Sequence, residues 1–247
     1  MDQVYCGPPP TPQTLAWAWQ YDPVAIGLCI VLVALHFRTG GGRPAVFSLG
    51  IGLLALLFLS PLCALTSALF AGRALHHVLL IAIVAPLLAM AYRGPGPART
   101  LLPLGWIAVL QAGILWFWHV PAVYERAIVS APLYWLMQLS LLGSGYLLWR
   151  AVLDRRQPTG TVLFVLLGTI VQMGMLGALL VFAGTPLYAA HFGTTQVFGM
   201  SPLDDQQLAG LIMWVPAALP YLAAALYRVS LSLAEPASTR RAGAWFG

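Results

Sequence analysis

The chain has 247 residues, of which 60% are hydrophobic and 8% are charged. Because a soluble domain carries about 25% charged residues, this composition predicts an integral membrane protein of a single domain, residues 1–247. The net charge of +5 comes from twelve arginines without any lysine, which excludes a retinal Schiff base. The arginines follow the expected membrane topology and therefore do not indicate binding to nucleic acid.

Residues 1–22 are expected to form an extracytoplasmic segment that leads into the first span. They contain no basic stretch followed by a continuous apolar run, so no cleavable signal peptide is expected. Trp17, Trp19 and Tyr21 are typical of an aromatic anchor at the membrane interface.

Seven apolar segments have about the length that a membrane-spanning helix needs. They predict an all-α fold, a polytopic bundle of seven transmembrane helices. Ser60 and Pro61 interrupt the second segment and predict a kink or an early end there. The segments lie near residues 23–37, 45–69, 74–92, 101–119, 132–152, 161–183 and 207–229.

The arginine positions predict the orientation of this bundle. With the N-terminus outside, ten arginines fall at the inner side and only Arg73 and Arg126 at the outer side. This asymmetry agrees with the positive-inside rule and predicts an N-out, C-in protein. The inner arginines are Arg38, Arg43, Arg93, Arg99, Arg150, Arg155, Arg156, Arg228, Arg240 and Arg241.

The connection before the last span, residues 184–206, is the one long loop, and long loops in compact bundles are usually functional or disordered. Near its end, Ser201, Pro202 and Asp204 are typical of a helix start, with a capping hydroxyl, a proline at the first helical position and an acid at the positive end of the dipole. Residues 235–247 are expected to form a flexible cytoplasmic tail.

Candidate metal ligands gather at the predicted outer side, whereas His36 lies alone at the inner side. Imidazole and sulfur ligands together suit copper(I), and polar groups at membrane depth tend to be functional. The candidate ligands are His77, His119, Asp204, Asp205, His76, Cys63, Met137 and His191.

Several of these residues have a purely structural interpretation as well. His76 and His77 point about 100° apart on a helix, so we expect one at most to face the bundle interior. His77 is favoured because it shares a helix face with Arg73. An aromatic belt that ends at a proline explains the surroundings of His119 equally well, and Asp204 fits a helix cap.

The three cysteines, Cys6, Cys29 and Cys63, are far apart and form no CxxC pair, so a disulfide framework is not expected. Cys63 also fits the role of a small buried residue. The sequence contains no HExxH, GxSxG or P-loop pattern. A hydrolytic enzyme is therefore not expected, and we predict a protein that is not an enzyme.

The run from Ser201 to Pro216, SPLDDQQLAGLIMWVP, resembles the most distinctive segment of the multi-pass CtaG family of cytochrome c oxidase assembly proteins. Further matching pieces follow the family's order, and the resemblance covers about residues 17–229. They are Tyr21-Asp22-Pro23, Ser60-Pro61-Leu62, His77-Val78-Leu79-Leu80, Ala85-Pro86-Leu87-Leu88, Trp118-His119-Val120-Pro121 and Pro186-Leu187-Tyr188.

The resemblance implies a multi-pass protein of the bacterial plasma membrane that matures a haem-copper oxidase. Its implied task is to stage or deliver copper at the outer face, with oxidase subunits and the lipid bilayer as partners. Two positions depart from the family: Arg73 stands where a histidine is common, and Met137-Gln138 stand where a Glu-His pair is common. The residues that match the family's polar positions are His77, His119, Asp204, Asp205 and Gln206.

Two other functions remain open at this point. A metal-free scaffold or accessory subunit of a respiratory oxidase is suggested by the missing imidazoles and by small residues that allow close helix approach. A b-type haem protein is suggested by His77 and His119 as axial ligands. The small residues are Gly143, Gly145, Gly174 and Gly177.

Overall fold

The computed structural model describes residues 4–40, 42–92 and 102–234. Over these ranges the chain is all-α and contains no strand, which confirms the all-α part of the predicted fold. The helices are α1 (Pro23–Arg38), α2 (Pro44–Leu59), α3 (Pro61–Ala68), α4 (Phe70–Leu79), α5 (Ala85–Ala91), α6 (Leu104–Trp118), α7 (Pro121–Val129), α8 (Ala131–Val152), α9 (Thr159–Phe182), α10 (Pro202–Trp214) and α11 (Ala218–Ala234), with short 3-10 turns at Leu15–Trp17, Ala189–His191 and Gln196–Phe198.

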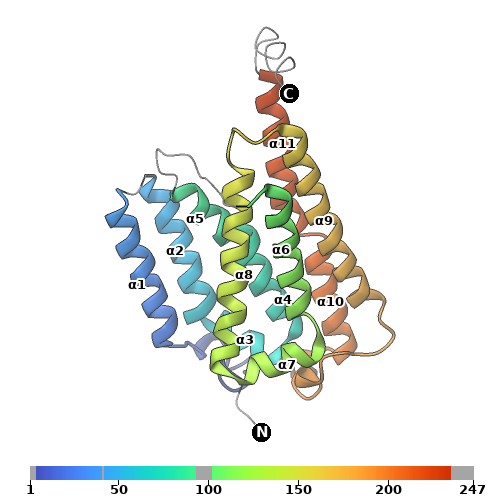
Figure 1. The fold of residues 1–247 in the computed structure, drawn as a ribbon. Coiled ribbons are helices and arrows are strands. Elements are labelled where there is room, and N and C mark those ends of the chain that lie inside the picture. The colour runs from blue at the N-terminus through green and yellow to red at the C-terminus, as the bar shows by residue number, and fades with distance from the viewer. Residues whose placement is uncertain (1–3, 41, 93–101, 235–247) are drawn as a thin grey trace.

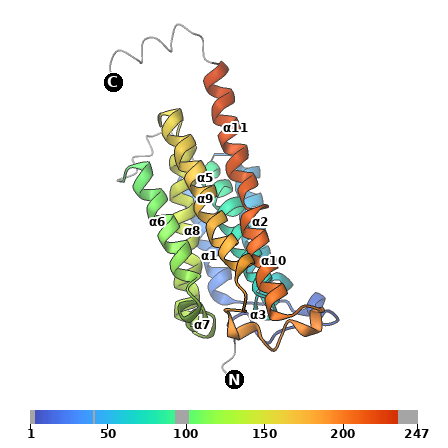
Figure 2. The same ribbon diagram turned by 90° about the vertical axis from the view of Figure 1, so that its right-hand side faces the viewer.

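The helices pack side by side in one bundle (Figures 1 and 2). Helix α1 packs on α2, α2 on α5, α5 on α8, α8 on α6 and α6 on α9. Helices α10 and α11 both pack on α9, and α10 also packs on α4, which lies inside the bundle. Figure 1 places the short helices α3 and α7 at one end, and the end of α11 at the other.

Prolines set the breaks in the long helices, because proline lacks the N–H that would continue the hydrogen-bond ladder. Helices α2 and α3 meet at an angle of 47° at Ser60 and Pro61, which confirms the predicted kink. A π-helical segment, Leu80–Val84, joins α4 to α5 just before Pro86. Pro216 lies at the break between α10 and α11.

Helix α7 is an element that the apolar pattern does not indicate. It follows α6 after a bend of 77° and lies across the end of the bundle (Figure 1). The sequence Val120-Pro121 both ends α6 and starts α7, because Pro121 occupies the first helical position.

Length and hydropathy identify three helices able to cross a membrane, Phe70–Ala91, Thr159–Phe182 and Pro202–Ala234. The number rises to five when each of the two bent pairs, α2 with α3 and α6 with α7, is taken as one span. Helix α1 is a shorter apolar helix. The described residues therefore form a membrane helix bundle, and a total of seven spans stays a prediction.

The N-terminal segment is fixed to the same end of the bundle as α3 and α7. Cys6 and Cys63 form a disulfide, so the expectation that no disulfide forms is wrong. The N–H of Tyr5 donates to the carbonyl of Ile128 at 2.8 Å. A disulfide that closes a long loop restricts the unfolded chain and so stabilises the folded one.

Helices α9 and α10 approach closely because glycines face each other. A Cβ placed on Gly210 would lie 2.5 Å from the carbonyl oxygen of Gly177, and one on Gly177 would lie 2.6 Å from that of Gly210. Gly145 and Gly174 also face neighbouring side chains, whereas Gly143 has open space beside it. Of the four small residues proposed for partner contacts, three therefore pack inside the bundle.

Replacing Gly210 with alanine should lower the stability of the protein. The added methyl group must push α9 and α10 apart, and overpacking of this kind costs about 1–3 kcal/mol. Gly168→Ala on α9 is the matched control, because no atom lies within 4 Å of its added Cβ. Thermal unfolding in detergent would measure both variants, and equal midpoints would contradict the close packing of α9 on α10.

Candidate functional site

Helix α4, which carries three of the polar residues of interest, begins inside the bundle with its first amides held by a carboxylate. Leu69 is extended, with φ −127° and ψ 132°, and the helix starts at Phe70. Asp205 of α10 accepts hydrogen bonds from the N–H groups of Phe70 at 2.7 Å and Ala71 at 2.9 Å. A carboxylate at this place satisfies unpaired donors and faces the positive end of the helix dipole.

The neighbours of Asp205 also bind backbone groups. Asp204 is exposed and forms a reciprocal capping box with Ser201, which confirms the predicted start of α10. Gln206 accepts from the N–H of Leu187 at 2.7 Å and donates to the carbonyl of Leu180 at 3.2 Å. The three polar residues of this run thus fix α10, α4 and the long loop relative to one another.

Four of the five histidines meet at this end of the bundle. The ring centroids of His76 and His77 lie 5.9 Å apart, and those of His77 and His119 lie 6.0 Å apart. The ring centroid of Phe70 lies 6.4 Å from that of His119 and 6.0 Å from that of His191. The convergence of these residues, from α4, the end of α6 and the long loop, agrees with their predicted placement at one end.

Both His76 and His77 are buried, with exposed fractions of 0% and 2%, so the expectation that only one faces the interior is wrong. The reason is that α4 packs against both α3 and α10 and is buried over most of its length. Neither ring nitrogen of His76 has a hydrogen-bond partner, and its ring packs edge-on against Phe58.

Two imidazole nitrogens of the cluster are available to a ligand. Nδ1 of His119 lies 2.7 Å from the carbonyl oxygen of Leu115, to which it donates, so Nε2 keeps its lone pair. Nδ1 of His77 has no partner, while its Nε2 lies 3.4 Å from the amide of Gln138. In this arrangement the amide nitrogen donates to Nε2; turning the amide so that its oxygen accepts from Nε2–H would leave the Nδ1 lone pair of His77 free for a ligand.

Arg73 is a buried cation one turn before His77 on the same helix. Its exposed fraction is 1%. One nitrogen, Nη2, donates to the carbonyl of Thr66 at 3.4 Å, and the guanidinium carbon lies 5.3 Å from the ring centroid of Tyr134. Nε and Nη1 have no hydrogen-bond partner. A charge this deep is costly and usually functional.

His191 joins the long loop to α7. Its Nε2 lies 2.8 Å from the hydroxyl of Tyr124, while its Nδ1 has no partner. Burial, together with the nearby Arg73 cation, lowers the pKa of His191 to about 4. His191 is therefore neutral at physiological pH.

The other candidate ligands do not complete a metal centre. Among the described residues, no three His, Cys, Asp or Glu side chains are close enough to hold an ion together. Asp205 uses both oxygens on backbone amides. Cys63 is bonded to Cys6 and so lacks the thiolate that a metal would bind. Met137 is fully buried in the core, and Asp204 is an exposed cap.

Two tyrosines of the cluster were not predicted as part of it. Tyr124 of α7 contacts His191, and Tyr134 of α8 lies under Arg73 and 3.4 Å from the sulfur of Cys6. Both are fully buried. In the sequence they do not differ from tyrosines of an aromatic belt, because their partners are more than 60 residues away along the chain.

The donor set of the cluster fits copper(I) in part. Two neutral imidazoles with free lone pairs suit this ion, and the hydrogen bond from His119 to a backbone carbonyl is the usual orientation of a metal-bound histidine. The nearby guanidinium opposes any cation. The cluster thus offers two nitrogen ligands, His77 and His119, beside one repelling charge.

Comparison with known proteins identifies a family over most of the chain. Residues 28–232 match the sequence model of the cytochrome c oxidase caa3 assembly factor family, Caa3_CtaG. No curated protein and no solved structure matches the chain at the significance required.

Acid should destabilise the folded protein partly through His191, and His191→Gln should make its stability less dependent on pH. Below pH 6.5 this residue binds a proton in the unfolded chain, whereas in the folded chain it binds one only near pH 4. The contribution of neutral His191 to the free energy of unfolding is therefore fully present above pH 6.5 and is lost as the pH falls toward 4. The loss is about 2 kcal/mol at pH 5. Unfolding midpoints of both proteins at pH 7.5 and 5 would measure it. Parallel losses would contradict a neutral buried His191.

Proposed function

Because this chain belongs to the cytochrome c oxidase caa3 assembly factor family, we propose that it stages copper(I) for a haem-copper oxidase at the His77–His119 pair. The protein acts as an assembly factor rather than an enzyme. Copper is the cargo, and the catalytic subunit of the oxidase is the recipient.

The observation that carries this proposal is the pair of adjacent imidazoles, His77 and His119, in one buried cluster. The ring centroids of His77 and His119 lie 6.0 Å apart. Nδ1 of His77 has no hydrogen-bond partner, and the hydrogen bond from Nδ1 of His119 leaves its Nε2 with a lone pair. Copper(I) accepts a small number of soft or imidazole ligands. Two ligands of this kind suit a cargo that must be released, because a complete protein cage would retain it.

We further propose that the cluster lies at the outer face of a bacterial plasma membrane, with the N-terminus outside. The positive-inside asymmetry supports this orientation. The Cys6–Cys63 disulfide supports it too, because disulfides persist in oxidising compartments and this one lies at the end of the bundle where the cluster lies. Arg93, Arg99, Arg240 and Arg241 fall outside the described residues.

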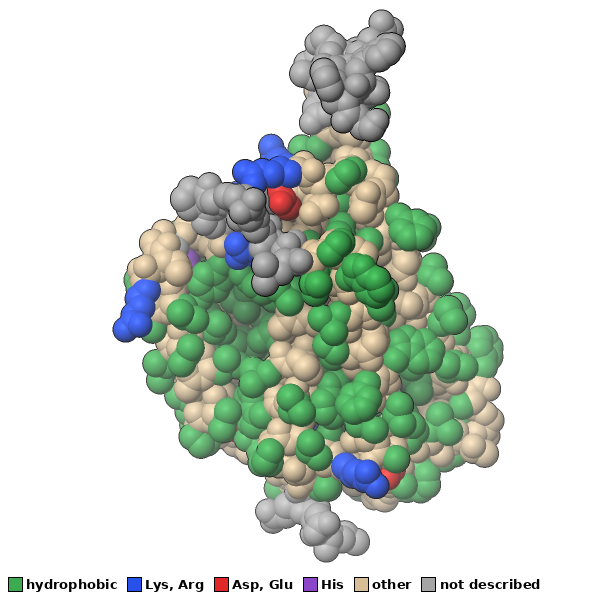
Figure 3. Space-filling view, in the orientation of Figure 1, with side chains coloured by type: hydrophobic (Ala, Val, Ile, Leu, Met, Phe, Trp, Pro, Cys, Tyr) green, Lys and Arg blue, Asp and Glu red, His purple; other side chains and the backbone are tan. Residues whose placement is uncertain are grey.

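The distribution of hydrophobic and basic side chains in Figure 3 is consistent with this orientation. Hydrophobic side chains cover most of the visible face, and Lys/Arg side chains appear mainly toward the C-terminal end of the bundle. Toward the opposite end, basic and acidic side chains lie beside each other. A face of this kind fits a surface in contact with lipid hydrocarbon.

A metal-free scaffold of the oxidase is the second candidate function, and Arg73 is the observation that favours it. The family commonly has a histidine at this position, and a buried guanidinium next to His77 repels a copper ion. In this function the cluster would hold α4 in place and the protein would bind oxidase subunits without metal. No described feature favours the b-type haem function over these two.

Copper binding by the purified protein tests the first function. Loaded with copper(I) under reducing, anaerobic conditions, the wild type should retain about one ion, and His77→Ala combined with His119→Ala should lose it. His36→Ala is the matched control, because His36 is equally buried but stacks on Phe47 elsewhere in the bundle. Elemental analysis after gel filtration is the measurement.

Stoichiometric copper in the double variant would overturn the proposed site. A wild type that carries no copper but co-purifies with oxidase subunits would establish the scaffold instead. In a deletion strain, recovery of oxidase activity on adding copper would support delivery, whereas continued loss of activity would support scaffolding.

A further inference from the structure

A groove at the other end of the molecule is not used by the proposed copper site. It has a volume of about 680 Å³, which lies within the range of ligand pockets. Its walls come from α1, α5 and α8. Helix α5 packs on α8 and on α2, and α1 packs on α2, so α1 and α8 flank α5 without closing over it.

The floor of the groove is hydrocarbon. It is lined by leucines from all three helices, Leu32 and Leu35 of α1, Leu88 of α5, and Leu139 and Leu142 of α8. Gly143 widens it, because a Cβ built there meets no atom within 4 Å. An apolar groove in a membrane protein does not stay empty, since its lining would lose dispersion contacts.

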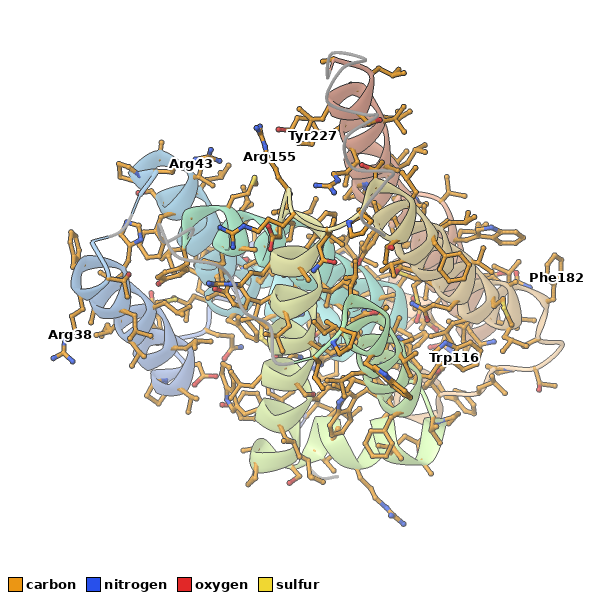
Figure 4. The ribbon with its side chains drawn as sticks, turned by 45° about the horizontal axis from the view of Figure 1, so that its top comes forward. Arg38, Arg43, Trp116, Arg155, Phe182 and Tyr227 are labelled. Carbon is orange, nitrogen blue, oxygen red and sulfur yellow. A yellow bond between two sulfur atoms is a disulfide. The ribbon has the colours of Figure 1, made fainter. Side chains whose placement is uncertain are left out.

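The mouth of the groove is polar and positively charged. Arg150 lines it, and its Nη1 donates to the hydroxyl of Tyr146 at 2.9 Å. This bond uses one of the five N–H donors of the guanidinium and fixes the direction of the rest. Thr39 and Gly40, from the connection that follows Arg38 at the end of α1, complete the rim. Figure 4 shows the side chain of Arg38 directed away from the bundle.

We propose that this groove binds an anionic phospholipid, with an acyl chain against the leucines and the phosphate beside Arg150. The arrangement matches the ligand in both of its parts, since an apolar slot beside α5 ends at a fixed guanidinium. Basic pockets between membrane helices are typical sites for acidic lipid headgroups. A zwitterionic lipid offers the same chains but a headgroup whose own cation opposes Arg150.

The inference is independent of copper, because the groove is lined by none of the clustered histidines. Binding in the groove also differs from the non-specific layer of lipid around a membrane protein, because retention of that layer would not depend on one arginine. A helix of an oxidase subunit is the other occupant that an apolar groove could take, and it has no need of a cation at the mouth.

Native mass spectrometry of the full protein from nanodiscs with equal phosphatidylglycerol and phosphatidylcholine tests the proposal. The wild type should retain phosphatidylglycerol in preference, and Arg150→Gln should lower that preference about fivefold. Arg155→Gln is the matched control, because Arg155 is exposed, bonds to Tyr227 and does not line the groove (Figure 4). Gly143→Trp should fill the slot and remove both lipids, and Gly168→Trp on α9 should not.

Equal retention of both lipids by the wild type would overturn the proposal, as would an equal effect of Arg150→Gln and Arg155→Gln. If Gly143→Trp abolishes co-purification of oxidase subunits while bound phosphatidylglycerol is unchanged, the groove holds a partner helix and the proposal fails. Should Gly143→Trp not fold, the comparison of the two arginine variants decides alone.

Discussion

The hydrogen bonds from the first amides of α4 to the carboxylate of Asp205 are the interaction on which the rest of the site depends. Helix α4 starts inside the bundle, where no water can satisfy its unpaired N–H groups. Asp205 supplies two acceptor oxygens, at 2.7 and 2.9 Å. Because Arg73, His76 and His77 follow within the next two turns, the position of the helix start sets the position of all three.

The capping aspartate is itself positioned by local structure. The Ser201–Asp204 box fixes the start of α10, and the packing of α10 on α9 through Gly177 and Gly210 fixes the helix axis. A chain of ordinary backbone interactions thus holds an unusual set of buried groups. The energy that these caps and contacts supply offsets the cost of burying Arg73 with two unpaired nitrogens.

Local signals in the sequence predicted much of the fold, because helix ends depend on neighbouring residues. The kink at Ser60-Pro61, the cap at Ser201 and the all-α class all follow from proline, serine and apolar runs within a few positions. Contacts between distant residues were not predictable in this way. The Cys6–Cys63 disulfide joins residues 57 apart in the chain, and the capping of α4 joins residues about 135 apart.

The candidate site shows the same difference between features set by local sequence and features set by distant contacts. Sorting histidines by predicted topology correctly grouped His76, His77, His119 and His191, since the ends of spans are readable from the sequence. The capping role of Asp205 was not predictable, because a carboxylate that caps a distant helix has the same sequence pattern as one that binds metal. Helix α7 was missed for a physical reason too, because Pro121 is equally compatible with ending α6 and with starting a new helix.

Amide hydrogen exchange across residues 66–76 tests the central interaction most directly. If Asp205 holds the start of α4, Asp205→Ala should speed exchange of the Phe70 and Ala71 amides, which would then lack an acceptor in a buried position. Asp204→Ala, which removes only an exposed cap of α10, should leave those two amides protected. Unchanged protection in Asp205→Ala would contradict the account, because α4 would then be positioned by something other than this carboxylate.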